Sequence, residues 1–138
     1  MKEKLILSGC LLLNKDKELL LLKRKDHGHY ETPGGKVETE GQIDLQVLRE
    51  TVERELKEEV GSEFEIDSLR FFSNVLFTTP DGKKAIANKF TANLISGEPK
   101  INEPELFSEL VWLPIDKLES VNLSPDLKII APLIKERL

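Results

Sequence analysis

The feature that most constrains the fold is a helical pattern placed between two segments of β-type sequence. Across residues 43–60, apolar side chains recur at spacings of three and four, namely Leu45, Leu48, Val52, Leu56 and Val60. This is the period of a helix with one buried face. Gly61 follows, and glycine commonly ends a helix because it adopts left-handed backbone angles without strain. The pattern therefore predicts a long helix that needs an apolar surface to pack on.

That surface is predicted to be a sheet built from two hairpins. Residues 4–13 and 18–24 are leucine-rich runs joined by the polar stretch "NKDK". Residues 68–78 and 84–96 flank the turn sequence "TPDG". Apolar runs separated by short polar turns are typical of β-hairpins. The glycine-containing stretch 25–35 between the first hairpin and the helix is predicted to be a loop.

The end of the chain adds a strand and a second helix. The run "ELVWLP" at 109–114 predicts a short strand, and Ser124 followed by Pro125 is a typical helix start. Pro132 is expected to kink or shorten that helix. We interpret residues 1–138 as a single domain of the α/β (α+β) class, a sandwich in which a mixed sheet carries helices on its faces.

Charge and composition exclude several classes of partner. The net charge is −5 and the pI is about 5.2, which disfavours binding to extended nucleic acid or to an anionic membrane. No segment approaches the roughly 20 apolar residues of a membrane span. The only cysteine, Cys10, lies in an apolar run and is expected to be a core thiol, which fits a cytoplasmic protein.

Three glutamates on the predicted helix are the candidates for chemistry. Glu55, Glu58 and Glu59 fall within roughly 100° of one helical face. Clustered carboxylates repel each other unless a cation lies between them, and Mg²⁺ prefers such oxygen ligands together with substrate phosphates. The same region also allows ordinary salt bridges of a solvated face, such as Arg54 with Glu58. Spacing alone favours that solvated face.

The order of the residues favours the metal site instead. The segments "PGGKVE" and "RELKEEVG", the latter Arg54–Gly61, closely resemble the signature of the Nudix hydrolase family, in particular its small MutT-like members. Ser62 stands where the family has an aliphatic residue. The distance from Gly35 to Arg54 (54 − 35 = 19 positions) is five residues longer than the family pattern.

The extra residues also affect the first glutamate of the signature. Counting back from Arg54 places it at Gln46, and counting forward from Gly35 places it at Gly41, so it is missing by either count. Arg54 would then pair with another carboxylate, and the sequence leaves four candidates open: Glu38, Glu40, Glu50 and Glu58. Thr39 and Gln42 have the form of a capping box, which predicts a helix start near residue 40.

The resemblance implies a Nudix α/β/α sandwich and an enzyme, a pyrophosphohydrolase that cleaves a nucleoside diphosphate linked to another group. It implies Mg²⁺, with Mn²⁺ as a possible substitute, held by Glu55, Glu58, Glu59 and the carbonyl of Gly35. Arg54 would orient the carboxylates, and Glu55 would also take part in the chemistry. The general base would come from the signature or from a later loop that offers Glu103, Glu105 and Glu109, of which we favour Glu105.

Substrate contacts are expected at the end of the second strand and just before the glycines. Lys23 and Arg24 are candidates for binding phosphate, and Tyr30 is a candidate for stacking on a base. For these three residues, a surface charge or hairpin packing explains the sequence equally well. His27 and His29 lack further ligands nearby, so a zinc site is not expected.

The sequence favours a small pyrophosphohydrolase that acts on (d)NTPs, including modified ones, and releases a nucleoside monophosphate. Subfamily motifs for other substrates are missing; for example, Thr78 stands where ADP-ribose hydrolases have a proline. The partner is expected to be a small-molecule nucleotide, and the protein a monomer or homodimer. Two other hypotheses remain open: a Nudix-like nucleotide sensor without turnover, and a structural domain without metal affinity.

Overall fold

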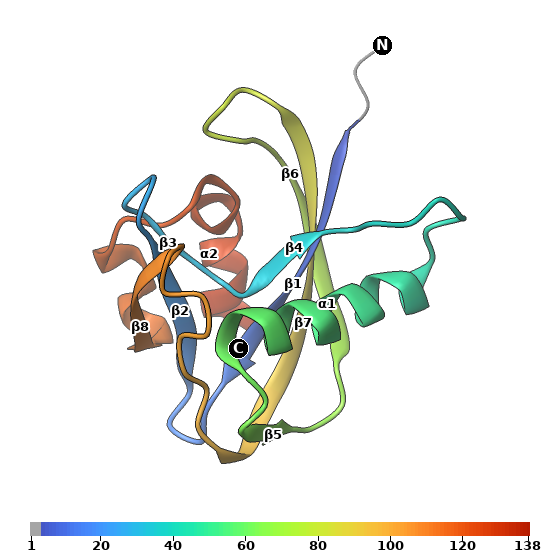
Figure 1. Ribbon diagram of the computed structural model, residues 1–138. Helices are drawn as coiled ribbons and strands as arrows, with labels where there is room; N and C mark the ends of the chain where they lie inside the picture. The colour runs from blue at the N-terminus through green and yellow to red at the C-terminus, as the bar shows by residue number, and fades with distance from the viewer. Residues whose placement is uncertain (1–3) are drawn as a thin grey trace.

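A computed structural model describes residues 4–138, and residues 1–3, which we assigned to the domain from sequence, lie outside the described part. Its elements, in chain order, are β1 (Leu5–Leu13), β2 (Glu18–Arg24), β3 (Tyr30–Glu31), β4 (Gly34–Lys36), α1 (Leu45–Val60), β5 (Phe64–Ile66), β6 (Arg70–Thr78), β7 (Lys84–Gly97), β8 (Phe107–Pro114), a 3₁₀ helix (Ile115–Ser120) and α2 (Pro125–Arg137). Figure 1 shows α1 in front of the strands and α2 behind them. No helix of the described part is long and apolar enough to cross a membrane.

The sheet is mixed, as predicted. Strand β7 runs parallel to β1 and pairs with the whole length of β1, from Leu5 beside Ala85 to Leu13 beside Asn93. All other pairings are antiparallel: β6 and β5 with β7, β4 and β2 with β1, and β3 and β8 with β2. Strand β4 pairs with the middle of β1, from Leu7 to Gly9, whereas β2 pairs with β1 only at the end of β1, where Leu13 lies beside Leu19.

The leucine-rich strands are continuous apolar runs because both of their faces are buried. Successive side chains of a strand point to opposite faces. In β1, Cys10 and Leu12 join the cluster under α1, whereas Leu11 and Leu13 join the cluster under α2. Strand β2 alternates in the same way. A sheet covered on both faces by helices gives such uninterrupted runs, so the sandwich follows from the sequence pattern.

Helix α1 begins later than its capping-box sequence predicted. The cap is Asp44, whose Oδ1 accepts a hydrogen bond from Val47 N at 3.0 Å. The predicted start near residue 40 is wrong because Thr39 Oγ1 instead accepts from Gly41 N, which makes a local turn. Residues 37–44 therefore form a loop, which projects from the body of the molecule in Figure 1. The helix ends at Gly61 as predicted, and the φ of 81° favours glycine there. The ψ of −171° is not that of the left-handed cap expected from the sequence.

Two other expectations need correction. Helix α2 starts at Pro125 as predicted, but it runs past Pro132 to Arg137, because Ala131 and Ile134 on either side of the proline are buried against the sheet. The segment 25–35, expected to be a loop, contributes strand β3 and the start of β4. The short strand β5 also had no periodic pattern of its own.

Candidate active site

The two glycines of "PGG" bring strand β4 and helix α1 into close contact. Gly34 lies beside Gly9 of β1, and a Cβ on Gly34 would stand 2.7 Å from Gly9 Cα and 2.8 Å from Ser8 O. A Cβ on Gly35 would overlap the Glu55 carboxylate, with Oε2 only 2.7 Å away. Glycine at both positions therefore allows the glutamate face of α1 to lie directly on β4.

The three glutamates share this face but differ in exposure. Glu59 is 5% exposed, and its Oε1 accepts a hydrogen bond from Gly34 N at 2.9 Å. The Glu55 side chain is 14% exposed, whereas that of Glu58 is 48% exposed. Glu59 therefore points to the protein interior, Glu58 points to water, and Glu55 stands between them above Gly35.

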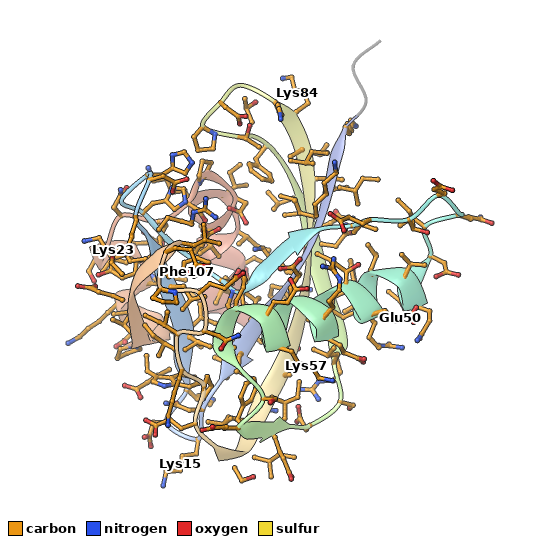
Figure 2. All side chains as sticks on the ribbon, viewed as in Figure 1. Lys15, Lys23, Glu50, Lys57, Lys84 and Phe107 are labelled. Atoms are coloured by element: carbon orange, nitrogen blue, oxygen red, sulfur yellow. The ribbon has the colours of Figure 1, made fainter. Side chains whose placement is uncertain are left out.

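Arg54 lies against two of the glutamates and against strand β4. Its Nη1 is 3.2 Å from Glu55 Oε1 and 3.4 Å from Glu58 Oε1, and its Nη2 donates to the carbonyl of Lys36 at 3.3 Å. Of the four partners left open by the sequence, the structure selects Glu58. Figure 2 shows Glu50 on the side of α1 away from β4. The guanidinium can thus fix the orientation of both carboxylates relative to the glycine strand.

The crowding of carboxylates disfavours their ionised forms. Burial raises the pKa of Glu59 to about 9, and the charges of Glu31, Glu55 and Glu103 add to this effect although the Gly34 N–H opposes it. Burial likewise raises the pKa of Glu55, where Arg54 opposes the shift. A bound cation would favour the charged forms that both residues need as ligands.

A loop after β7 brings a fourth glutamate to the same face. The loop is tied to the end of α1 because Lys100 N donates to Val60 O at 3.0 Å and Asn102 N donates to Glu59 O at 2.9 Å. The Asn102 side chain also donates to Glu58 O at 3.0 Å. These bonds hold the following residue, Glu103, near α1.

Of the three loop candidates for the general base, Glu103 has the closest electrostatic connection to the glutamates. Its negative charge raises the pKa of both Glu55 and Glu59. Burial, together with the charges of Glu105 and Glu58, raises the pKa of Glu103 itself. Glu105 is exposed, and Glu109 accepts a hydrogen bond from the Tyr30 hydroxyl. The sequence alone does not distinguish these three glutamates. Glu103 differs from the other two because hydrogen bonds hold the residue before it against the end of α1.

The chemistry of the donor set fits a hard divalent cation. Glu55, Glu58, Glu59 and the Gly35 carbonyl offer only oxygen ligands, which Mg²⁺ and Mn²⁺ prefer. Among residues 4–138, no three His, Cys, Asp or Glu side chains converge into a metal-binding arrangement, and Arg54 Nη1 lies between Glu55 and Glu58. The exposed Glu58 and Arg54 side chains would therefore have to rotate for the three carboxylates to bind one ion.

A cavity of about 330 Å³ opens beside the glycine strand. Leu5, Leu7, Phe77 and Ala87 provide apolar surface, and Gly34 and Gly35 lie at the side where α1 carries Glu55. Its polar lining includes Arg24, Glu31, Thr32, Lys89, Ser124 and Asp126. Of these, only Arg24 was identified from the sequence. Lys89 is a buried charge in the middle of β7, and its sequence neighbours, Asn88 and Phe90, give no signal that marks it as a cavity residue.

The three substrate-binding candidates do not converge on one site, although Lys23 and Tyr30 are paired between β2 and β3. Arg24 lines the cavity, where its Nη2 binds Asp26 at 2.7 Å and its Nε lies 3.5 Å from Glu31 Oε1. Lys23 and Tyr30 are outside the cavity lining, and the Lys23 ammonium lies 5.7 Å from the Tyr30 ring centroid. Figure 2 shows Lys23 at the edge of the molecule, well apart from α1.

The comparison with protein-family models places this geometry in a known family. The model described as the NUDIX domain matches residues 6–135. The chain belongs to the Nudix family. As a Nudix domain it is a member of a family of pyrophosphohydrolases, and the resemblance drawn from "RELKEEVG" is confirmed.

Solved structures share the fold of this Nudix domain. The MutT NUDIX hydrolase from Burkholderia pseudomallei is 24% identical with a TM-score of 0.74, and the match covers 99% of each chain. The MutT protein from Methanosarcina mazei Go1 is 23% identical with a TM-score of 0.75, covering 99% of this chain and 97% of that one. The NUDIX domain of Shewanella oneidensis NrtR, in complex with ADP ribose, is 21% identical with a TM-score of 0.73, covering 99% and 90%. The comparison with curated proteins gives no match.

Proposed function

We propose that this Nudix domain hydrolyses a (d)NTP or a modified nucleotide and releases a nucleoside monophosphate, with Mg²⁺ or Mn²⁺ as cofactor. The observation that carries the proposal is the contact between Glu55 and Gly35 at the side of a 330 Å³ cavity. That contact places a carboxylate-rich helix face next to a space of the size that binds small molecules. A diphosphate lying along the glycine strand would reach both the cavity and the glutamates.

Each residue of the face has a definable role. Glu55, Glu58 and Glu59, with the Gly35 carbonyl, would hold the metal, which supplies charge neutralisation of the diphosphate and activation of a water molecule. Arg54 orients the Glu55 and Glu58 carboxylates through its contacts at 3.2 and 3.4 Å. The cationic Arg24 in the cavity lining supports a role in binding phosphate.

The general base is proposed to come from the loop that Asn102 attaches to α1. Glu105 was favoured from the sequence, but its neighbour Glu103 is the stronger candidate because its charge acts on both Glu55 and Glu59. A raised pKa brings a carboxyl group closer to the range in which a general base works best. Lys23 and Tyr30 have weaker support as substrate contacts because they lie outside the cavity lining.

The test compares two glutamates of the same helix. We expect the purified protein, with Mg²⁺ or Mn²⁺, to release a nucleoside monophosphate from at least one of a panel of (d)NTPs, oxidised nucleotides and nucleotide sugars. The second product is pyrophosphate from a triphosphate and a sugar phosphate from a nucleotide sugar. Glu58→Gln should lower kcat by at least ~100-fold through loss of a metal ligand. Glu50→Gln, on the side of α1 away from β4, is the matched control and should retain activity.

The main alternative is a sensor that binds nucleotide without turnover, which the missing first glutamate suggested. Calorimetric binding of nucleotide with no product in any assay would support the sensor and contradict the hydrolase. Equal activity of Glu58→Gln and the native protein would contradict the assigned metal face. We also propose that residues 1–138 form a single domain and that the protein works in the cytoplasm.

A further inference from the structure

Arg24 lies where strand β2 ends, on the sheet face that α1 covers. Leu20 and Leu22 of the same strand pack in the cluster under α1, and side chains two positions apart on a strand share a face. The pairing of β2 with β8 shifts between Lys23 and Arg24, so that Arg24 lies opposite Phe107. Such bulges often redirect a side chain. The guanidinium carbon lies over the buried Phe107 ring, 5.8 Å from its centroid, so the ring supports one side of the group.

Asp26 binds one edge of this guanidinium. Its Oδ1 accepts from Arg24 Nε at 2.9 Å, and its Oδ2 accepts from Arg24 Nη2 at 2.7 Å. The carboxylate is itself fixed, because Oδ1 also accepts from His27 N at 2.8 Å in the turn between β2 and β3. The hydrogen bond from Arg24 holds the pKa of Asp26 below its usual value, so the pair is ionised at neutral pH. Two parallel bonds of this kind fix the plane of a guanidinium as well as its position.

The other edge of the guanidinium is left for a ligand. An arginine has five N–H donors, and within residues 4–138 those on Arg24 Nη1 have no acceptor. Arg24 lines the cavity whereas Asp26 does not, so the occupied edge is the one turned away from the cavity. The Asp26 hydrogen bond raises the pKa of Arg24, and the charge of Glu59 adds to this shift. Arg24 is therefore within electrostatic reach of the glutamate face of α1.

An ion pair that only stabilises a surface turn is the alternative explanation. The Asp26 side chain is 50% exposed and that of Arg24 is 27% exposed, and such pairs contribute little to stability. A role in the turn alone would not require the arginine to line a cavity, to rest on Phe107 and to keep Nη1 without an acceptor. These three features together favour a ligand at the free edge.

We propose that Asp26 is a positioning residue for phosphate binding, which holds Arg24 by its Nε and Nη2 edge so that Nη1 meets a phosphate oxygen of the nucleotide. This inference rests on the proposed function, in which Arg24 binds phosphate. A mobile arginine loses rotamer freedom when a ligand orders it, and that loss weakens binding. Asp26 orders the side chain before the nucleotide binds. The negative charge of Asp26 by itself would repel phosphate, so orientation and charge predict opposite effects.

The test is Asp26→Asn, which keeps an acceptor for His27 N but cannot accept both parallel bonds from Arg24. The KM for the best nucleotide substrate should rise about three- to tenfold, as expected when binding must immobilise one more flexible side chain. Partial unfolding lowers the apparent kcat but not KM, so lost stability does not explain such a rise. A KM at the native value overturns the inference. A KM below it does so too, and would identify Asp26 as a competitor of phosphate for Arg24.

Two comparisons separate orientation from other effects. Arg24→Met removes the residue through which Asp26 acts, so Asp26→Asn should add no further change in KM in that background, and a further rise of about threefold or more overturns the inference. Asp67→Asn is the matched control. Asp67 also pairs with an arginine, Arg70 at 3.3 Å, and both lie outside the cavity lining. This control should keep the native KM, and a rise equal to that of Asp26→Asn would overturn the inference.

If no nucleotide is hydrolysed, the proposed function fails, and calorimetry with inorganic pyrophosphate and Mg²⁺ tests the inference separately. Binding by the native protein that is about three- to tenfold weaker in Asp26→Asn supports Asp26 as a positioning residue. Equal or tighter binding by the variant overturns the inference. Absence of binding by the native protein also overturns it, because Arg24 would then not be a phosphate contact.

Discussion

Three identical side chains within five positions of α1 acquire different properties from their surroundings. Glu59 is buried and hydrogen-bonded to Gly34 N, Glu55 is half-buried above Gly35, and Glu58 is open to solvent next to Arg54. The exposed glutamate can exchange its arginine partner for a ligand at small cost, because surface ion pairs contribute little. The buried one positions the glycine strand. Glutamates of a single signature therefore differ in burial, in hydrogen-bond partners and in freedom to move.

Glu31 is a further acid of the cavity whose environment has a measurable consequence. Its Oε1 is buried without a hydrogen bond, although Arg24 Nε lies 3.5 Å away. Burial raises the pKa of Glu31 from 4.5 to about 7. Between these values the folded protein keeps a proton that the unfolded chain has released, so the free energy of unfolding falls as pH rises through this range.

We therefore predict that the Glu31→Gln variant becomes more stable, relative to the native protein, as the pH increases. The difference in free energy of unfolding between the variant and the native protein should shift by about 1–3 kcal/mol in favour of the variant between pH 4.5 and pH 8, since glutamine does not ionise. Urea titrations at pH 4.5, 6 and 8 with a chelator present measure the difference. Glu136→Gln, at an exposed position, is the control. A pH-independent difference for Glu31→Gln would contradict the prediction.

At the scale of elements, the sequence predicted those with a strong period and missed those held by their neighbours. The helix at Leu45–Val60 and the strands around "TPDG" follow directly from apolar spacing and turn residues. Strand β4 could not be found in this way, because Gly34 and Gly35 have no strand propensity and pair with β1 only through tertiary contact. The start of α1 was misjudged because Thr39 and Asp44 are both good caps, and local sequence does not choose between them.

In the candidate site too, the sequence predicted what a local pattern determines and missed what depends on tertiary contacts. The spacing of Glu55, Glu58 and Glu59 predicted one face of a helix, and the structure places that face against Gly35. The buried Lys89 was missed because a lysine in a strand has no local signature that distinguishes a buried position from an exposed one. Its partner Asp126 lies 37 positions away (126 − 89), and only the fold joins them.

The cap assignment can be tested with two substitutions. Asp44→Ala should lower the free energy of unfolding by about 1 kcal/mol, because Val47 N loses the side-chain acceptor that caps the start of the helix. Thr39→Ala removes only a hydrogen bond within an exposed loop and should change stability by less than ~0.5 kcal/mol. Urea midpoints of both variants measure the effects. The reverse order would place the true start of α1 near residue 40.

At the scale of the whole molecule, strands β1 and β2 are shared by both halves of the core. Cys10 and Leu12 pack under α1, while Leu11 and Leu13, their neighbours on the same strand, pack under α2. Strand β8 divides in the same way, with Trp112 on the α1 side and Val111 on the α2 side. Loss of packing on one face must therefore disturb the strands that support the other. Helix α1, which carries the candidate site, and helix α2 are expected to fold as one cooperative unit.

This coupling predicts that a substitution that leaves a cavity under α2 also destabilises the packing under α1. Ile134 of α2 is fully buried, and Ile134→Ala should lower the free energy of unfolding by about 2–5 kcal/mol. The only tryptophan, Trp112, packs with the cluster under α1 and so reports on the opposite face. Its fluorescence and the far-ultraviolet circular dichroism should shift to the same lower urea midpoint, as two-state unfolding requires.

The control for this prediction lies on the same helix. Ile129 is 55% exposed, and Ile129→Ala should leave both midpoints nearly unchanged because little apolar surface returns to water. If Ile134→Ala separated the two signals, with circular dichroism falling first and Trp112 fluorescence later, α2 would unfold independently of the sheet face that α1 covers. Coincident transitions would instead mean that any substitution that weakens α2 lowers activity by reducing the folded fraction. Activity losses far from Glu55 would then have to be corrected for stability before they are assigned to catalysis.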